Sequence, residues 1–431
     1  MAKEKSGFSL KVLIANSHTS LNSGDAGILI GHVIFLRKKF ECKNITVITR
    51  TPIQDREIYK DYNLTFLPPI IPTPLIFKSG TQRIKENLTN LFSIWSRFRL
   101  ISEIRKSDFV VVCGGANFFS NWKFFPGPMF FQHYLHILIS ILFKKPIFFF
   151  PQSFGPFKNK ASVFLTKVLF ASKYIKKIWA REEFSYRILL NLVKRKSLAG
   201  VCPDMAFLID LRTKELPVAQ YSNLSRPAVV LTLRNWSFPN IKNRKFKLEK
   251  KELYLNAVVN TCRYITESLN GSIIFLPSSK GIKELEDDRI IIKEVLDIIG
   301  KSIPKDKIYC PVLKENESIF HIASLISSAD LVLATRFHPS IFASILGIPT
   351  LSMAYHHKCS GIMKMMNLDR YCIHISKINS RELIQGVDEI LKNRDSVRRD
   401  LSEAVSKIRN EIEKNLYEEL YPFIFQVKKN K

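Results

Sequence analysis

The chain has 431 residues, of which 46% are hydrophobic and 24% are charged, a composition that excludes a disordered or fibrous protein and allows two domains with full-size cores. Its formal net charge of +28 is uneven, because residues 1–200 hold 31 Lys and Arg against 11 Asp and Glu (net +20) and residues 201–431 hold the remaining +8. Such a surface suits a nucleic acid, a phosphorylated substrate or an anionic membrane, or it serves only solubility. The seven cysteines form no CxxC pair, and no set of His, Cys and carboxylates has metal-ligand spacing, so we expect reduced thiols and no metal.

The first elements alternate between strand and helix. An apolar run predicts a strand over Ser9–Asn16, apolar residues at helical spacing predict a helix over Asp25–Phe40, and Asn44–Thr49 is the next strand. These elements form a βαβ unit. Phe109–Cys113 and Ile147–Phe150 are unbroken apolar runs, which are typical of central strands in a parallel sheet.

The segment Phe124–Phe143 contains no charged residue, so it is a candidate for a membrane-spanning helix. Prolines, a glycine and two histidines interrupt it, and only Tyr134–Phe143 is mostly apolar. Because a spanning helix needs about 20 mostly apolar residues, we expect a core or interfacial helix here. Residues 1–7 are polar, so no signal peptide is expected.

A second series of strands and helices begins near residue 226. The expected strands are Ala228–Leu233, Ser272–Leu276, Lys307–Cys310, Leu331–Ala334 and Thr350–Met353. The expected helices are Lys250–Leu269, Glu286–Ile299 and Asn316–Ser327. The proline-flanked stretch Arg212–Arg226 is the expected linker between the two series.

This alternation predicts an α/β protein with two Rossmann-like, doubly wound lobes and a cleft between them. We expect an N-terminal lobe over residues 1–215, a C-terminal lobe over residues 216–400 and a helical tail over residues 401–431. Active sites in such sheets lie at the carboxyl ends of strands, so the candidate motifs are sought there.

Two loops of the first lobe are candidates for ligand binding. Asn22–Asp25 opens the first helix, where Gly24 permits a tight turn and Asp25 is placed to cap the helix. Gly114-Gly115, followed by Asn117, lets the backbone approach a ligand closely. Each loop either binds an anion or a sugar or is an ordinary turn after a strand.

Two further motifs of the first lobe are equally open. Pro151–Phe157 predicts a stiff loop that carries Gln152 and Ser153 at a strand end, either as a site or as a structural turn. Arg181 precedes the expected helix Glu183–Val193. Its guanidinium either binds a carboxylate or phosphate bidentately or pairs with a nearby acid.

The strongest motif is Arg336–x–His338 in the second lobe, directly after an apolar strand. Pro339 suits the first helical position, which places His338 at or beside the helix cap. A helix N-terminus beside an arginine is an anion site, and a histidine there can act as general acid or base. Arg234, at the end of the first strand of this lobe, faces the same expected cleft. We therefore favour a functional role over a capping histidine.

The other histidines and one acidic pair give weaker signals. His133 and His136 lie on an apolar segment and are expected to be satisfied core or interfacial residues, whereas His18 lies in the first loop. Lys358, next to His356-His357, is a plausible phosphate contact. Asp287-Asp288 is as plausible a helix cap as a metal ligand.

Taken in order along the chain, these motifs resemble those of the polysaccharide pyruvyl transferase family. They are Asn22–Asp25, the Gly114-Gly115 strand end, Pro151–Phe157, Arg181-Glu182, Pro203–Phe207, Arg234, Arg336–His338, Phe342-Ala343, and Tyr355 with Lys358. Each motif is loose, but the ordered series is specific and extends over about residues 11–370.

The resemblance implies a fold like that of the GT-B glycosyltransferases and transfer of a pyruvyl unit from phosphoenolpyruvate to sugar hydroxyls, usually as a cyclic ketal. It implies that His338 is the general acid, which protonates the methylene carbon of the donor. The donor-binding residues that it implies are Arg234, Arg336, Phe337, Lys358 and Arg181. The residues expected to line the acceptor side or the cleft are Asn22, Gly24, Asp25, Gly114, Gly115, Asn117, Gln152 and Ser153.

The acceptors that the resemblance implies are exopolysaccharide, capsule or cell-wall glycans, or their lipid-linked precursors. The chain departs from the family pattern in its first lobe, at Asp25–Ile28, Cys113–Gly115 and Ser120-Asn121, so the acceptor stays open. A basic first lobe suits a diphosphate–lipid anchor, and we expect a cytoplasmic protein that can bind peripherally at the inner face of the cell membrane. No nucleic-acid partner is expected, and no cofactor besides phosphoenolpyruvate as the donor substrate.

Two other classes of function remain as alternatives. The first is a nucleotide-sugar-dependent GT-B glycosyltransferase in surface polysaccharide synthesis, which often holds the ribose through an acid near the end of the second lobe; Gly347–Tyr355 contains none. The second is a basic binding module without catalysis, although no nucleic-acid motif is present.

Overall fold

The computed structural model describes residues 9–71, 94–120, 122–211, 224–239, 241–279, 287–311, 318–355 and 357–429. The chain divides into two compact units. Unit 1 contains Met1–Ser20, Asp25–Ile209 and Ile408–Lys431, and unit 2 contains Leu21–Gly24 and Asp210–Lys407. The expected linker Arg212–Arg226 lies mainly outside the described residues.

Unit 1 is built on a parallel sheet with the strand order β3-β2-β1-β4-β6-β7-β8, and β5 pairs with β6. The strands are β1 (Lys11–Ala15), β2 (Asn44–Ile48), β3 (Thr65–Leu67), β4 (Phe109–Val112), β5 (Gly115–Ser120), β6 (Ile147–Phe157), β7 (Ile175–Ala180) and β8 (Ala199–Val201). The strand order reverses between β1 and β4. The strands predicted from apolar runs are confirmed, and most of their ends lie within one or two residues of the predicted ones.

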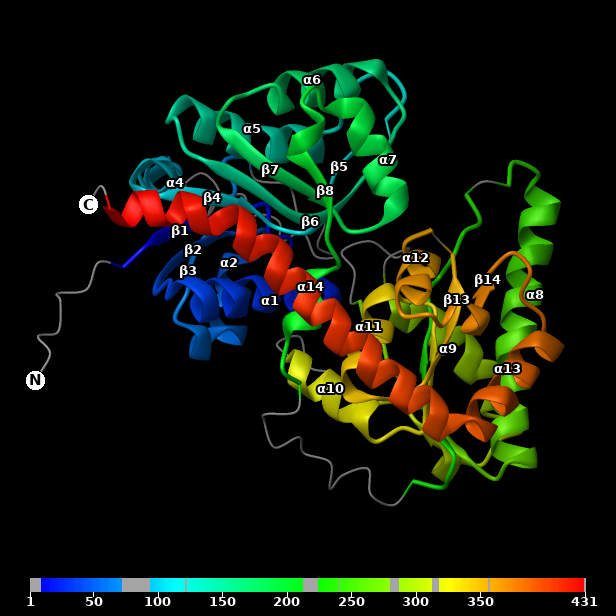
Figure 1. Cartoon of the computed structure of the whole chain (residues 1–431). Coiled ribbons are helices and arrows are strands. Elements are labelled where there is room, and N and C mark those ends of the chain that lie inside the picture. Colours follow the sequence, from blue (N-terminus) through cyan, green and yellow to red (C-terminus); the bar gives the residue numbers. More distant parts are fainter. Residues whose placement is uncertain are drawn as a thin grey trace, which may run out of the picture. The chain divides into compact units, whose positions relative to one another are not determined.

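Helices cover both faces of this sheet (Figure 1). They are α1 (Ser23–Phe40), α2 (Pro52–Ile58), α4 (Ile94–Lys106), α5 (Pro128–Leu142), α6 (Lys160–Phe170), α7 (Glu183–Leu192) and the C-terminal part of α14 (Arg394–Lys429), with 3-10 turns at Lys60–Tyr62, Lys196–Leu198 and Met205–Leu208. Val110 and Phe149 pack in one cluster with residues of α4 to α7. Their neighbours Phe109 and Phe148 instead contact Phe423 of α14, with ring centroids 6.2 and 5.6 Å apart. Apolar residues on both faces explain the unbroken apolar runs of these strands.

Two local expectations in unit 1 are corrected. The stretch after Phe150 is not a loop, because β6 continues to Phe157, and Pro151 is tolerated where the pairing with β7 is irregular between Phe149 and Gln152. Helix α1 begins at Ser23, so Asp25 lies inside its first turn and does not cap it. The helix expected within Phe124–Phe143 is confirmed as α5, which begins at Pro128.

Unit 2 has its own parallel sheet, with the order β11-β10-β9-β12-β13-β14. Its strands are β9 (Ala228–Thr232), β10 (Ser272–Phe275), β11 (Ile308–Tyr309), β12 (Leu331–Ala334), β13 (Thr350–Ala354) and β14 (Cys372–His374). Its helices are α8 (Arg244–Arg263, continued by a π-helix over Tyr264–Ser268), α9 (Asp288–Ile299), α10 (Ile319–Ser327), α11 (Phe337–Leu346), α12 (His357–Met365), α13 (Ser380–Lys392) and the start of α14, with 3-10 turns at Lys305–Lys307 and Asp369–Tyr371. The strand order reverses between β9 and β12. Two Rossmann-like α/β units are therefore confirmed.

Candidate active site

The reversal of strand order in unit 2 brings two predicted site residues together. Thr232 of β9 is paired in register with Ala334 of β12, so Arg234 and Arg336 each stand two residues beyond a paired position. In open α/β sheets, ligands bind outside the carboxyl ends of the strands at such a reversal. The two arginines flank that position in unit 2.

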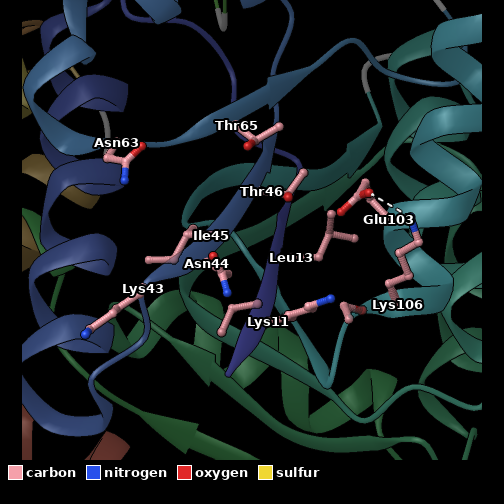
Figure 2. A pocket seen from close by; sticks show the side chains of 12 residues that line it. Lys11, Leu13, Lys43, Asn44, Ile45, Thr46, Asn63, Thr65, Glu103 and Lys106 are labelled. Atoms are coloured by element: carbon pink, nitrogen blue, oxygen red, sulfur yellow. Dashed lines mark ion pairs between the residues drawn. The ribbon is translucent and has the colours of Figure 1, made fainter. Parts of the chain in front are cut away.

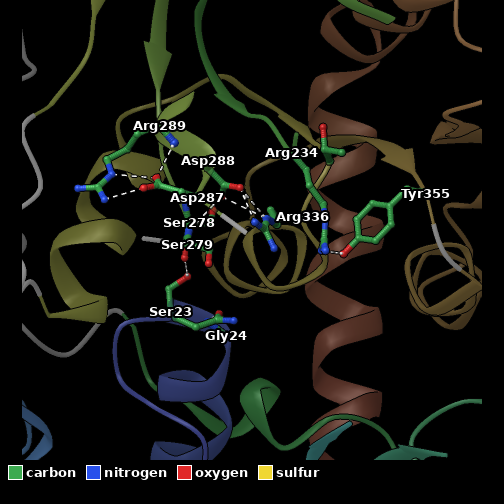
Figure 3. Close-up of polar contacts among 12 residues, drawn as sticks. Ser23, Gly24, Arg234, Ser278, Ser279, Asp287, Asp288, Arg289, Arg336 and Tyr355 are labelled. Atoms are coloured by element: carbon green, nitrogen blue, oxygen red, sulfur yellow. Dashed lines mark hydrogen bonds and ion pairs between the residues drawn. The ribbon is translucent and has the colours of Figure 1, made fainter. Parts of the chain in front are cut away.

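Asp288 holds the guanidinium of Arg336 (Figure 3). Arg336 Nε lies 3.0 and 3.1 Å from the two carboxylate oxygens, and Nη2 donates a further hydrogen bond to Oδ1. The backbone N–H groups of Ser278 and Ser279 donate to Oδ2 at 3.1 and 3.0 Å. Burial raises the pKa of Asp288, while the ion pair and these donors favour its charged form. Asp287, not Asp288, caps α9, by accepting from Arg289 N at 3.0 Å.

Arg234 is held against two aromatic rings. Its Nη1 donates to the Tyr355 hydroxyl at 2.6 Å, and its guanidinium carbon lies 4.5 Å from the centroid of that ring and 5.6 Å from that of Trp236. Burial raises the pKa of the Tyr355 hydroxyl, which therefore stays protonated. The Nε–H of Arg234 is buried and has no hydrogen-bond partner among the described residues. A buried guanidinium donor of this kind is suited to an anionic ligand.

His338 lies in the first turn of α11, which begins at Phe337 with Arg336 as its N-cap. The expectation that Pro339 takes the first helical position is wrong, because the helix starts two residues earlier. The imidazole lies 4.8 Å from the Phe337 ring, edge to face. A Cβ on Gly24 would overlap Nδ1 of His338, so the ring rests against bare backbone. Only a glycine at this position permits that contact.

The residues around Gly24 are tied to the same part of unit 2. Asn22 pairs with Ser279 in an antiparallel bridge, and its Oδ1 accepts from Gly24 N at 2.9 Å, so Asn22 rather than Asp25 serves the start of α1. Ser23 Oγ donates to the Ser278 carbonyl at 3.2 Å (Figure 3). The structure thus brings Asn22 and Gly24, expected on the acceptor side, next to His338.

The other two basic residues predicted to bind the donor are Lys358 and Arg181. Lys358 lies in α12, but its side chain is outside the described part of the chain, so its donor contact stays a prediction. Arg181 belongs to unit 1, where it is buried. Its Nε donates to Ser153 Oγ at 2.8 Å and its Nη1 to Asp204 at 2.6 Å. These contacts fit the alternative in which this arginine pairs with an acid.

The reversal in unit 1, between β1 and β4, carries the two predicted glycines. Gly115 has a φ of +108°, and a Cβ on Gly114 would lie 2.6 Å from the Pro151 carbonyl oxygen, so both positions require glycine. Asn117 is buried and donates to the Cys113 carbonyl at 2.9 Å, which makes it a support for the turn.

Two polar residues of β6 and two histidines of α5, all singled out from the sequence, are also buried in unit 1. Gln152 is fully buried, and neither polar atom of its side chain has a partner among the described residues. Ser153 Oγ donates to Glu182 at 3.0 Å. His133 and His136 are buried and hydrogen-bonded to Asn117 and Asn16, as predicted for core histidines. Burial lowers the pKa of each to about 3.

A pocket lies at the opposite edge of the unit 1 sheet and contains no predicted site residue (Figure 2). It has a volume of about 380 Å³ and is lined by the amino ends of β1 to β3 and the end of α4, including Lys11, Asn44 and Lys106. Lys106 pairs with Glu103 at 3.6 Å. Ligands of parallel sheets bind at the other, carboxyl edge.

The two parallel sheets, each reversing its strand order once, define an α/β protein of GT-B-like architecture. Similar solved structures include a putative UDP-N-acetylglucosamine 2-epimerase from Listeria monocytogenes (14% identity, TM-score 0.57, 95% of this chain and 98% of that chain). They also include HepE of Anabaena in complex with UDP (12% identity, TM-score 0.56, 96% and 100% of the two chains).

The chain belongs to the polysaccharide pyruvyl transferase family, whose model matches residues 22–357. It is also similar to the amylovoran biosynthesis protein AmsJ of Erwinia amylovora, with 23% identity over 422 residues, which are 93% of this chain and 96% of that protein. The resemblance seen in the motifs is therefore confirmed for the family.

Sequence reasoning missed the roles of Asp288, Ser278 and Trp236 beside the arginines. The signal for Asp288 was an acid directly after Asp287, where one cap is enough for a helix start. Ser278 contributes its backbone groups, which leave no mark in a sequence. Tyr355 was part of the family motif but was not assigned to the site.

Proposed function

We propose that the protein transfers the pyruvyl group of phosphoenolpyruvate to two hydroxyls of a cell-surface glycan, or of its lipid-linked precursor, and releases phosphate. The observation that carries this proposal is the grouping of Arg234, Arg336 and His338 around the reversal of unit 2. Two guanidinium groups and the N-terminus of α11 suit a small donor that bears both a phosphate and a carboxylate. Family membership supports the same chemistry.

The proposed reaction has two additions at C2 of the donor. First, one sugar hydroxyl forms a C–O bond at C2 and loses its proton, while His338 delivers a proton to the methylene carbon, which becomes a methyl group. The C–O bond to phosphate then breaks, and the second hydroxyl adds at C2 and loses its proton. The products are a cyclic pyruvate ketal and inorganic phosphate. Arg234 and Arg336 bind the phosphate and carboxylate throughout.

The acceptor side of the proposal is supported less directly. The similar protein AmsJ is named for amylovoran biosynthesis, and the family is named for polysaccharides, which together favour a polysaccharide acceptor here. Gly115, with its φ of +108°, stands where the strand order of unit 1 reverses, and open α/β sheets bind ligands at such a position.

The test of donor binding is a calorimetric titration of the purified protein with phosphoenolpyruvate. Wild type should bind, and Arg336→Ala should weaken binding by about tenfold or more, as loss of a charge-assisted contact does. Arg289→Ala is the matched control, because Arg289 follows Asp288 in the chain and pairs with Asp287 at 2.7 Å. Equal losses in both arginine variants would contradict the assignment.

The test of catalysis is phosphate release, which should require both phosphoenolpyruvate and a glycan. His338→Ala should abolish turnover, while the affinity for phosphoenolpyruvate stays within about threefold of that of wild type. An unchanged rate would contradict the role of His338. Binding of a nucleoside diphosphate, with no binding of phosphoenolpyruvate, would instead favour the glycosyltransferase alternative.

A further inference from the structure

A long stretch of unit 1 carries only positive charge. Residues 109–181 contain ten Lys and Arg and no Asp or Glu, which is half of the net +20 of residues 1–200. The stretch supplies β4 to β7 together with α5 and α6. Every exposed charge on these elements therefore has the same sign, and nine of the ten basic residues are lysines.

The loop before α5 displays aromatic rings from this stretch. Phe124 is 84% exposed, and Trp122 and Phe125 are each about half exposed. The rings of Trp122 and Phe125 pack together with centroids 4.8 Å apart, and Lys123 Nζ lies 5.7 Å from the centre of the Phe124 ring. Apolar side chains are thus turned to solvent beside a positive charge.

The loop is fixed to the start of α6. Asn159, the buried N-cap of α6, donates from Nδ2 to the carbonyls of Trp122 and Phe125 at 2.9 and 3.1 Å. Its Oδ1 accepts from Ser162 N at 2.7 Å. One side chain therefore caps the helix and ties the loop that carries the exposed rings to the start of α6.

The outer face of α6 continues the same pattern. Phe164, 65% exposed, and Val168, about half exposed, stand one helical turn apart, and Lys160 lies one turn before Phe164. Lys167 lies beside Phe164 on the next ridge. We call Trp122–Phe125 together with Lys160, Phe164, Lys167 and Val168 the aromatic–lysine surface.

We propose that the aromatic–lysine surface binds the headgroup region of an anionic phospholipid bilayer. Exposed apolar side chains beside Lys123, Lys160 and Lys167, on elements that carry no acid, match such a surface in both hydrophobicity and charge. The lysines favour lipid over nucleic acid, whose recognition depends largely on arginine forks. This inference extends the proposed function by placing the enzyme where a lipid-linked acceptor would be, but its test needs neither donor nor acceptor.

The experiment is flotation of the full chain with lipid vesicles. The vesicles contain phosphatidylcholine alone or with about one third phosphatidylglycerol, at about 0.05 M and about 0.5 M salt. Wild type should float with the anionic vesicles at low salt only. Phe124→Ser with Phe164→Ser, and separately Lys160→Glu with Lys167→Glu, should each lower binding about tenfold or more.

The matched control is Phe425→Ser. Phe425 is 56% exposed on α14, and Lys428 and Lys429 follow it. Phe423, two residues before it, contacts Phe109 on the other face of the same sheet. This control should bind as wild type does. Equal losses in the control and in the surface variants, equal binding to both kinds of vesicle, or no vesicle binding would each overturn the proposal.

A second measurement uses the fluorescence of the Trp122 ring. Trp122 fluorescence should shift to shorter wavelength when anionic vesicles are added, and Trp122→Phe should remove that shift while flotation persists. Melting temperatures within about 2 °C of wild type will show that the variants are folded. Binding to single-stranded DNA that is lost in the same variants, without flotation, would assign the surface to nucleic acid and overturn the proposal.

Discussion

Arg336 lies where the strand order of unit 2 reverses, and it forms one half of a buried ion pair. Asp288 has no exposed surface and receives donors from Arg336 and from two backbone N–H groups. A long guanidinium side chain without such a partner would lose rotamer freedom each time it bound a ligand. In the proposed function, Asp288 is therefore a positioning residue for Arg336.

The first prediction concerns this pair. Asp288→Asn should lower the free energy of unfolding by about 3 kcal/mol, because removal of one partner leaves a charge without its counterion in a buried site. Urea denaturation measures the change. Asp287→Asn is the control and should cost less than about 1 kcal/mol, since asparagine still caps the helix and only a more exposed ion pair is lost.

The second prediction concerns Gly24. An alanine in an exposed helix normally stabilises by about 1 kcal/mol relative to glycine, but a Cβ here overlaps the His338 ring. Gly24→Ala should therefore displace His338 and reduce turnover about a hundredfold, as misplacement of a reacting group does. Steady-state phosphate release measures the effect. Ser23→Ala, which removes only a 3.2 Å hydrogen bond, should keep most of the activity, and equal losses would contradict the argument.

At the scale of elements, helix α5 shows how burial of polar groups makes a helix sensitive to pH. His133 and His136 point into the core of unit 1 and are neutral there, because burial lowers the pKa of each to about 3. In the unfolded chain each takes up a proton near its ordinary value of about 6.5. Stability is thus full above pH 6.5 and is lost as the pH falls toward 3.

The third prediction follows from that sign. Each of these histidines should remove about 2 kcal/mol of stability between pH 7 and pH 5, because only the unfolded chain gains its proton in this window. Urea denaturation at a series of pH values measures the slope. His136→Gln should reduce the slope by about one proton. A slope that the substitution leaves unchanged would show that His136 is charged in the folded protein.

Strand β6 is longer than the strand predicted from the sequence. The apolar run up to Phe150 was identified, but the strand continues through Pro151 and Gly155. Its second half pairs with β5, although the glycines at the start of β5 predict a turn. Neither segment forms a strand by its own propensity; the pairing of one with the other makes both extended.

At the scale of the whole molecule, helix α14 ends on unit 1. Arg409 donates from Nε to the Phe207 carbonyl at 2.7 Å and from Nη2 to the Ile209 carbonyl at 2.6 Å. Further along, Phe423 contacts Phe109 and Phe148 of the central strands. The last turns of the chain thus cover a sheet formed mainly by its first half. No helix of the described residues is long and apolar enough to cross a membrane.

The fourth prediction tests that cover. Phe423→Ala should lower the free energy of unfolding by about 2 kcal/mol, because two buried rings lose their contact. Phe425→Ala, two residues away and mostly exposed, should change it by less than about 0.5 kcal/mol. Thermal unfolding of both variants measures the difference. Similar values would mean that the end of α14 does not cover the sheet.

The sequence by itself determined the two series of strands, the concentration of positive charge in residues 1–200, and the Arg336–x–His338 motif after β12. These features could be predicted because apolar runs, charge and side-chain type are local properties of a chain. The family resemblance rested on the same local motifs.

Only the tertiary structure decided the partners of these residues. Asp288 and Arg336 are 48 positions apart, and Gly24 meets His338 from the opposite end of the sequence. It also decided that Arg181 faces Asp204, whereas Arg234 lies against Tyr355. The physical reason is that burial and ion pairing depend on which groups folding brings together and shields from water, and no residue type records that choice.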